Sequence, residues 1–549
     1  MAGAASNRSR KNGGVPWIWV CAAAVAASVA MVIGLVLLIA VKGLAYFWPA
    51  TVLEFDYRAE DAAAGGTVRI IGELAGKGTV SVAEGEATVV AQRLLLKTGN
   101  RDFYGADFRW LLRDAMGELR APRELTLVER REWGNLYGYL QGLEEDGRGL
   151  EARDDAQLWR LLQDRIAAAQ GLYARIRVLE KEEIGKANYR LEKLRLQERR
   201  LQLEGAATPA AVAALAAQRQ QLLARHARIG QRLGELRREL ARAQMLLRLS
   251  DGRTVTVPIA QVHRAYRPNA MTPLARGGFF CGKLWEFLTE DPREANTEGG
   301  VFPAIYGTVL MVLLMTLLVS PFGVIAAIYL HEYARQNLLT RIVRISVNNL
   351  AGIPSVVYGV FGLGFFVYFA GGALDRLFFP EALPTPTFGT PGLLWASMTL
   401  ALLTVPVVIV ATEEGLSRVP RALREGSLAL GATQAETLFR TVLPITAPAI
   451  LTGQILAISR AAGEVAPLML VGAVKLAPSL PIDGNFPYFH LERKFMHLGF
   501  HIYDVGFQSP NVEAARPLVY ATALLLVLIV LVLNLIAIVI RNRLRRRVS

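Results

Sequence analysis

The chain has 549 residues and a mean hydropathy of +0.31, which is high for a wholly soluble protein, although its middle section is dense in charge. The separation of apolar segments from a charged middle section favours membrane spans plus a soluble domain over a single globular core. Many of the basic residues behind the net charge of +14 flank apolar runs, so membrane topology explains the charge better than nucleic-acid binding does. With only Cys21 and Cys281, the sequence offers no disulfide framework, and it shows no zinc-binding spacing.

Residues 1–15 form a basic leader in front of an apolar run at residues 16–42. A cleavable signal peptide has an apolar region of only about 7–15 residues, whereas this run reaches the ~20 residues needed to cross a bilayer. We therefore expect an uncleaved first transmembrane helix whose basic end lies in the cytoplasm.

Residues 50–292 are predicted to form a soluble domain of β-strands and long helices. Three β-rich runs separated by glycines predict a small sheet: Thr67–Ile71, Gly78–Val82 and Ala87–Ala91. Two further runs flank Asp251 and Gly252, a pair that predicts a hairpin with a type I′ turn.

A charged helical section lies between these β regions. Apolar residues at seven-residue spacing predict an antiparallel coiled-coil hairpin at about 156–249, with its turn between Gly205 and Pro209. The rows are Ala187, Leu194 and Leu201 in the first half, and Leu215, Leu222, Ile229, Leu236 and Ala243 in the second. Two roles are open for this hairpin, a spacer and a partner-binding arm.

One segment, Gly72–Thr79, resembles a phosphate-binding loop but is rejected. Ile71 stands where the pattern needs glycine, and Gly78 stands where it needs serine or threonine. A strand rather than a helix is predicted to follow, so no helix N-terminus would hold a phosphate. We expect no catalytic residue, cofactor or metal in this chain, and any ATP hydrolysis must come from another chain.

Five more apolar runs predict membrane spans: Val301–Leu330, Ile345–Phe369, Leu393–Val410, Ala447–Val471 and Leu518–Ile540. With the first helix they give six crossings, five of them in a core at residues 301–541. The predicted fold class is therefore mainly α, a six-helix transmembrane bundle with an inserted β and coiled-coil domain.

Basic residues orient this bundle. Arginines gather in three places: residues 335–344, residues 418–440 and the tail at 541–549. The connection at 371–391 carries only Arg376. By the positive-inside rule both termini are cytoplasmic, so the domain at 50–292 is extracytoplasmic, on the periplasmic side.

A polar connection at residues 412–445 joins the fourth and fifth spans. Ser417 is placed to cap a helix whose early turns contain Pro420, and Glu425 lies among arginines that can hold its carboxylate. Gly431 then permits a turn, and Pro444 begins the return into the membrane.

This connection resembles the Glu-Ala-Ala loop of ABC-importer permeases, which carries a glycine four residues after the second alanine and Ile-x-Leu-Pro beyond it. The spacing matches throughout, while Gly426, Ser427 and Thr441 differ from the commonest residues. The resemblance implies a cytoplasmic docking site for an ATPase subunit. The residues that it assigns to coupling are Glu425, Gly426, Ser427, Gly431, Leu443 and Pro444.

Beyond this loop, the chain is similar to phosphate-importer permeases of the PstA type. The similar stretches are residues 296–300, 323–334, 352–359 and 457–468. The resemblance implies a permease bundle in the bacterial inner membrane that imports inorganic phosphate. It implies as partners a second phosphate permease, a dimer of ATPase subunits, a periplasmic phosphate-binding protein and the lipid bilayer. It does not explain the domain at 50–292.

Arg460 and Glu464 stand four residues apart inside the predicted fifth span, and therefore on one face of a helix. A charged residue there costs about 2.5–3.5 kcal/mol on insertion scales, so it normally faces a cavity or a bundle interior. The arginine fork suits an oxyanion, and Glu464 would hold it until an anion competes. The alternative is a salt bridge that only fixes helix packing. Gly352, Pro354 and Gly359 in the third span would either loosen a pore-lining helix or permit close packing.

Two other functions remain open. One is import of another oxyanion, such as sulfate or molybdate, which competition in an uptake assay would reveal. The other is a membrane-anchored scaffold or signalling protein that acts through the outer coiled coil. Deleting about Glu151–Leu249 separates the second from a permease, because transport should largely survive the loss of an accessory domain.

Overall fold

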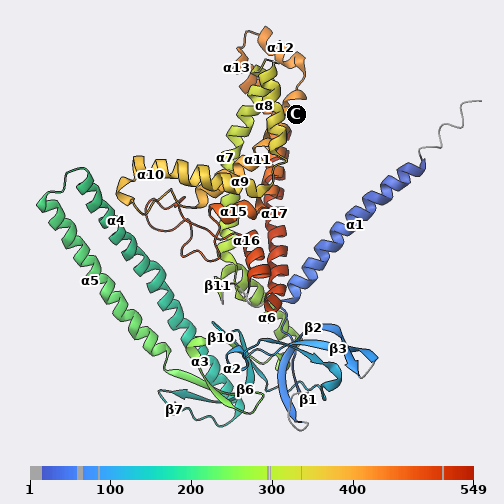
Figure 1. Cartoon of the computed structure of the whole chain (residues 1–549), viewed down its shortest axis with the longest axis vertical. Coiled ribbons are helices and arrows are strands. Elements are labelled where there is room, and N and C mark those ends of the chain that lie inside the picture. The colour runs from blue at the N-terminus through green and yellow to red at the C-terminus, as the bar shows by residue number, and fades with distance from the viewer. Residues whose placement is uncertain are drawn as a thin grey trace, which may run out of the picture.

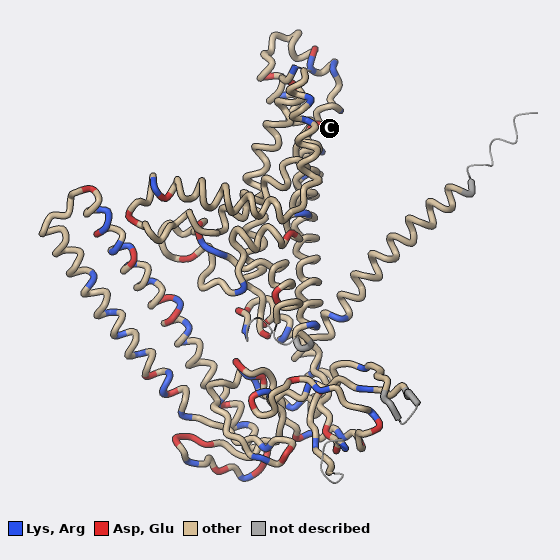
Figure 2. Tube along the Cα trace, in the orientation of Figure 1, with Lys and Arg blue, Asp and Glu red and all other residues tan. Residues whose placement is uncertain are grey.

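The computed structural model describes residues 15–58, 66–84, 87–293, 296, 298–335, 337–509 and 512–548. The predicted leader, apart from its last residue, lies outside the described residues. A bundle of long helices stands over two β-sheets and a helical hairpin, as Figure 1 shows. Charged residues are dense in the sheets and the hairpin and sparser along the bundle and the first helix (Figure 2).

Among the described residues, six helical segments are long and apolar enough to cross a membrane, which confirms the predicted number. They contain α1 (Val15–Ala45), α7 (Phe302–Ile328), α9 (Ser355–Phe361) with α10 (Gly372–Phe378), α11 (Leu393–Ser417), α14 (Leu443–Gly463) and α17 (Val512–Val548). The sixth is longer than predicted, because α17 continues from the span through the basic tail as one helix.

The third span begins later than predicted. Residues Leu338–Leu350 form a separate helix, α8, and the chain is non-helical from Ala351 to Pro354 before α9 starts. A residue that precedes proline avoids the helical conformation, and Pro354 has no N–H to donate into a continuing helix. The predicted run Ile345–Phe369 therefore joined the end of α8 to the true span, which continues through the π-helical segment η7 (Gly362–Gly371).

The bundle is centred on α11, which packs between α7 and α14, while α17 packs on α14. Small residues permit these close contacts. A β-carbon at Gly323 of α7 would lie 2.7 Å from Cγ1 of Val408 in α11. The first helix, α1, is exposed along its span and meets α17 near its end, where a β-carbon at Gly43 would lie 2.9 Å from the Tyr520 carbonyl oxygen. Such exposure suits a helix surrounded by lipid.

Two antiparallel sheets lie between α1 and α6 (Pro273–Thr289). The first has the order β1-β2-β3-β4, and the second β10-β5-β6-β8-β9 with β7 paired to β6. The strands are β1 Val52–Arg58, β2 Thr67–Glu84, β3 Ala87–Lys97, β4 Phe108–Leu112, β5 Thr126–Arg130, β6 Asn135–Glu145, β7 Arg148–Gly149, β8 Ala243–Arg248, β9 Thr254–Pro258 and β10 Val262–Tyr266. Two predicted runs are thus one strand, β2. The β8–β9 hairpin forms, but in its turn only Gly252 (φ +85°) is left-handed, so the turn is not type I′.

A helical hairpin projects from the second sheet. Its limbs are α3 (Asp155–Val178), the π segment η2 (Leu179–Ile184) and α4 (Gly185–Leu203) on one side, and α5 (Pro209–Leu240) on the other. Its base is buried, since Leu162 and Leu240 belong to the same core as Met245 of β8. The predicted range to residue 249 was too long, because the helix ends at Leu240 and Ala243 lies in β8. Ala243, the first residue of that strand, continued the seven-residue spacing by coincidence.

The hairpin contacts two connections of the bundle through α4. The Tyr189 hydroxyl donates a hydrogen bond to the Phe486 carbonyl oxygen, and the Lys193 ammonium lies 5.9 Å from the centroid of the Phe486 ring. The Tyr189 ring also meets the buried His490 ring edge-on, at 6.4 Å between centroids. In addition, α4 packs against the short segment η8 (Pro380–Ala382). The hairpin therefore packs against the helical bundle as well as against its own sheet.

A buried carboxylate joins the second sheet to the start of the bundle. Glu286 of α6 lies 3.0 Å from Nε2 of His263 and 2.7 Å from both Arg264 and Arg293. Burial alone would raise the pKa of Glu286. The hydrogen bond with His263 and the charges of Lys283, Arg293 and Arg264 outweigh burial and hold that pKa well below its usual range. Glu286 thus fixes β10 to the segment that leads into α7.

Candidate functional site

The connection between α11 and α14 lies at the end of the bundle that points away from the sheets (Figure 1). It contains α12 (Arg421–Ala429), α13 (Gln434–Thr437) and the π segment η9 (Leu438–Val442), which runs directly into α14. We call this connection, from Arg418 to Val442, the distal loop. It includes most of the residues that the sequence assigned to coupling.

Local signals set the turns of the distal loop. Gly431 adopts φ +89° after α12, a left-handed conformation that favours glycine. Thr433 and Glu436 then form a capping box at the start of α13. Leu443 is the first residue of α14, and Pro444 lies in its first turn, where a missing N–H breaks no helical hydrogen bond.

Polar contacts hold α12 against three other elements. Arg424 donates a hydrogen bond to the Leu416 carbonyl oxygen at the end of α11 (2.8 Å) and pairs with Glu332 just beyond α7 (2.9 Å). The hydroxyls of Ser427 and Thr437 lie 2.9 Å apart and join α12 to α13. A displacement of α12 would therefore be transmitted to the ends of α7 and α11, and through α13 and η9 to the start of α14.

Two expectations for this loop are wrong. Ser417 does not cap α12, because it is the last residue of α11 and its hydroxyl donates back to the Glu414 carbonyl oxygen (2.8 Å). Nor do arginines hold Glu425, which is exposed and forms no ion pair among the described residues. Its neighbour Arg424 turns inward to Glu332 instead. Glu425 is thus left exposed at the end of the bundle.

The distal loop also exposes large apolar side chains that sequence reasoning missed. They are Leu423, Leu428, Leu430 and Phe439, of which Leu430 is 91% exposed and Phe439 66% exposed. Leu423 and Leu430 stand seven residues apart, a spacing that could have signalled a shared apolar face. Exposed apolar side chains gathered at a polar end of a protein mark a surface for a protein partner.

The helix that carries Arg460 is interrupted. It ends at Gly463, Glu464 is extended (φ −75°, ψ 132°), and a short helix, α15 (Ala466–Val471), follows. In a continuous helix Pro467 would clash with the Gly463 carbonyl and could not donate a hydrogen bond to it. The local sequence, through Pro467, therefore explains why the helix stops at Gly463.

Because of the interruption, the predicted continuous span Ala447–Val471 is wrong. So is the placement of Arg460 and Glu464 on one helix face. The two side chains nevertheless pair, with Nε of Arg460 3.7 Å from Oε1 of Glu464. They are 33% and 21% exposed, so each keeps part of its surface open in the single chain. This leaves hydrogen-bonding capacity on the guanidinium for a further group.

The glycines and proline of the third span divide between two roles. A β-carbon at Gly359 would lie 2.7 Å from Cα of Pro467, so α9 packs closely on α15. For Gly359, close packing is thus the correct interpretation. Gly352 and Pro354 precede the span in the non-helical stretch after α8. The structure therefore brings Gly359, but not the other two, into contact with the helix that follows Glu464.

One group of described residues has the spacing of a metal site. Ligand atoms of His263, Glu286 and Glu290 all lie within 4.8 Å of one another. Glu286 already accepts hydrogen bonds from Arg264 and Arg293, whose positive charges would repel a cation. The group fits an ion-pair network better than a metal site.

Comparison with known proteins finds a family whose model matches the C-terminal part of this chain. Residues 319–549 match the family model described as binding-protein-dependent transport system inner membrane component. The chain is 32% identical over 203 residues to the probable ABC transporter permease protein YqgH of Bacillus subtilis, covering 36% of this chain and 62% of that protein. It is 35% identical over 202 residues to the phosphate transport system permease protein PstA 1 of Mycobacterium tuberculosis, covering 36% and 60%.

The chain thus spans about three fifths of the length of these curated relatives. A solved structure of the MetNI methionine ABC transporter in inward-facing conformations is similar to 45% of this chain and 94% of that chain. Its identity is 18% and its TM-score 0.32, too low to support any detail. Residues 319–549 are thus similar to the inner membrane components of binding-protein-dependent transport systems, and the described residues include six helices long and apolar enough to cross a membrane.

Proposed function

We propose that this chain is a membrane subunit of an ATP-driven importer for inorganic phosphate. The observation that carries the proposal is the interrupted helix, which presents Arg460 and Glu464, each partly exposed, between membrane-spanning segments. An ion pair at such a position marks a substrate pathway more often than it serves packing alone. The similarity to a relative named as a phosphate transport permease supports phosphate as the substrate.

In this proposal a second permease subunit covers the open side of the Arg460–Glu464 pair and completes the pathway. Arg460 then binds phosphate oxygens through its guanidinium fork, and Glu464 releases the guanidinium as the anion arrives. Because the separation between the two groups is 3.7 Å, their bond is weak enough to exchange.

The distal loop supplies the coupling to ATP. Leu423, Leu430 and Glu425 would enter a groove on an ATPase subunit, and closure of the ATPase dimer would displace α12. The Arg424–Glu332 pair would carry this displacement to the end of α7. The path through α13 and η9 leads into α14, which ends at the charged pair. The chain itself transmits the work of ATP hydrolysis and does not perform it.

The proposed topology places the distal loop and both termini in the cytoplasm and the sheets and hairpin in the periplasm. The positive-inside rule favours this orientation. The distal loop and the sheets lie at opposite ends of the bundle, which supports it (Figure 1). A periplasmic phosphate-binding protein would then deliver phosphate at the sheet side.

Uptake of labelled phosphate into proteoliposomes tests the substrate. The full transporter with ATP should accumulate phosphate, and a tenfold excess of sulfate or molybdate should leave the rate within about twofold. Strong competition by either oxyanion would move the assignment to that anion. Absence of ATP-driven phosphate uptake by the assembled transporter would overturn the proposal.

Replacing Arg460 tests the pathway. The change Arg460→Gln should lower phosphate uptake at least tenfold, because a hydrogen bond to a charged group contributes about 1.5–3 kcal/mol. The complex should still assemble and hydrolyse ATP. Arg376→Gln, at an exposed arginine of α10 at the end of the third span, is the matched control and should transport normally. Unchanged uptake by the Arg460 variant would assign Arg460 to helix packing.

A further inference from the structure

The two limbs of the hairpin face different surroundings. The limb α4 lies between α5 and the bundle (Figure 1), and Tyr189 and Lys193 use its bundle side to contact Phe486. The other limb, α5, packs on α3, η2 and α4. Its buried leucines face those helices, and its remaining surface is exposed.

The exposed surface of α5 is strongly basic. The helix has six arginines against two glutamates, a net charge of +4. Arg219, Arg225 and Arg228 are exposed and form no ion pair among the described residues, whereas Arg232 pairs with Glu235 at 3.0 Å. Arg225 and Arg228 stand one turn apart, where like charges destabilise a helix, so helix stability does not explain their presence.

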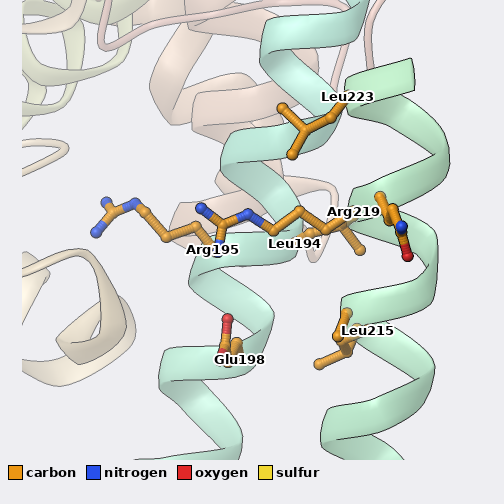
Figure 3. Close-up of a pocket in the computed structure, with 8 residues that line it drawn as sticks. Leu194, Arg195, Glu198, Leu215, Arg219 and Leu223 are labelled. Carbon is orange, nitrogen blue, oxygen red and sulfur yellow. The ribbon is translucent and has the colours of Figure 1, made fainter. Parts of the chain in front are cut away.

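A groove between α4 and α5 includes one of these arginines, Arg219, and mixes apolar side chains with Arg195, Glu198 and Gln220. Figure 3 shows Leu194 of α4 with Leu215 and Leu223 of α5 where the two helices face each other, and Arg195 and Arg219 beside them. Leu223 is 49% exposed although it lies beside the helix–helix seam. Leu215 is buried beneath the groove, so Leu223 is its accessible apolar side chain on α5. Arginine next to an accessible apolar side chain is a composition that favours a protein interface.

We propose that Arg219, Arg225 and Arg228, together with the groove at Leu194, Leu215 and Leu223, form a docking surface for an acidic face of the importer's soluble substrate-binding protein. The proposal rests on the proposed function, which requires such a protein and places the hairpin on its side of the membrane. Charge complementarity selects an acidic partner, and it disfavours a second copy of the hairpin, which is equally basic.

Among acidic partners, we favour the binding protein because of where the hairpin lies. Phe486, which α4 contacts, lies in the connection between α15 and the next helix, α16 (Leu498–Tyr503). That connection follows the interruption at Glu464, so a protein held on the hairpin stands beside the segment that must admit the substrate. A bilayer surface fits less well, because an interfacial helix needs an exposed apolar face, and α5 packs its own against α3 and α4.

The test measures binding of the phosphate-loaded binding protein to the full transporter in nanodiscs. Arg219→Glu, Arg225→Glu and Arg228→Glu combined should raise the Kd at least tenfold at low salt and flatten its salt dependence. The matched control reverses three exposed arginines of the sheet domain, Arg123, Arg148 and Arg153, and should leave the Kd within twofold. Equal affinity for the two triple variants would overturn the proposal.

Additional variants and measurements separate the alternative explanations. If the triple glutamate variant fails to fold, the triple glutamine variant replaces it, and its affinity for the binding protein should fall at least threefold. A loss of self-association instead of binding-protein affinity, or a loss of binding to anionic vesicles alone, would overturn the proposal in favour of a second copy or lipid. Phosphate uptake is measured on the same wild-type preparation. Binding without phosphate uptake would refute only the proposed substrate, and uptake with unchanged variant affinity would refute only the docking surface.

Discussion

Replacing Glu425 with lysine is expected to abolish ATP-driven uptake while the chain still folds and inserts. Glu425 is exposed on α12 and forms no ion pair among the described residues, so its replacement should change stability by no more than about 0.5 kcal/mol. On a partner surface, however, a reversed charge costs several kcal/mol, which corresponds to at least a ~100-fold weaker complex. We therefore expect loss of the ATPase subunits, with loss of uptake as its consequence.

Copurification of the ATPase subunits and uptake of labelled phosphate measure this effect. The matched control is Glu414→Lys, which reverses an exposed glutamate (62% exposed) on the last turns of α11 and breaks only its surface pair with Arg418. The control should retain the ATPase subunits and uptake. Normal uptake by the Glu425→Lys transporter would show that α12 does not form the coupling contact.

Replacing Glu286 with glutamine is expected to destabilise the junction between the second sheet and the bundle by about 3–5 kcal/mol. Removing one partner of a buried ion pair leaves the remaining charges uncompensated, and this penalty exceeds the worth of the pair itself. Glu286 is 6% exposed and lies among Arg264, Arg293 and Lys283. The buried Glu129 of β5 pairs with Lys283 (2.5 Å), and the more exposed Glu290 lies 3.5 Å from Arg293, but among the described ion pairs only Glu286 bridges both Arg264 and Arg293.

Thermal unfolding in detergent measures this effect. The matched control is Glu290→Gln, at a glutamate that is 43% exposed, and it should shift stability by less than about 1 kcal/mol. The pKa of Glu286 is lower in the folded state than its ordinary value of 4.5. The ionised Glu286 carboxylate therefore adds its full share to the free energy of unfolding above that pH. This share is lost as the pH falls toward the folded-state pKa. Equal unfolding temperatures for wild type and the Glu286 variant at pH 7 would contradict this role.

Local patterns determined much of this molecule. Six apolar runs of sufficient length predicted six membrane-spanning helices, because backbone groups in lipid must bond within a helix. Glycine and proline at fixed spacing predicted the distal loop, and the β-rich runs predicted strands. The interruption after Arg460 was also present in the sequence, as Gly463 followed by Pro467, but the apolar run hid it. Hydropathy averages over a window and does not register where helical hydrogen bonds stop.

The tertiary structure alone decided which residues meet. It placed Gly359 against Pro467, turned Arg424 inward to Glu332 and thereby left Glu425 exposed. It also packed α4 against the connection that contains Phe486. It left exposed the face of α5 that is turned away from α3, η2 and α4. Periodicity gives the faces of a helix, but the neighbour of each face comes from segments as far apart as Tyr189 and Phe486. Those choices depend on packing and on charge pairing across the whole chain, which no local pattern contains.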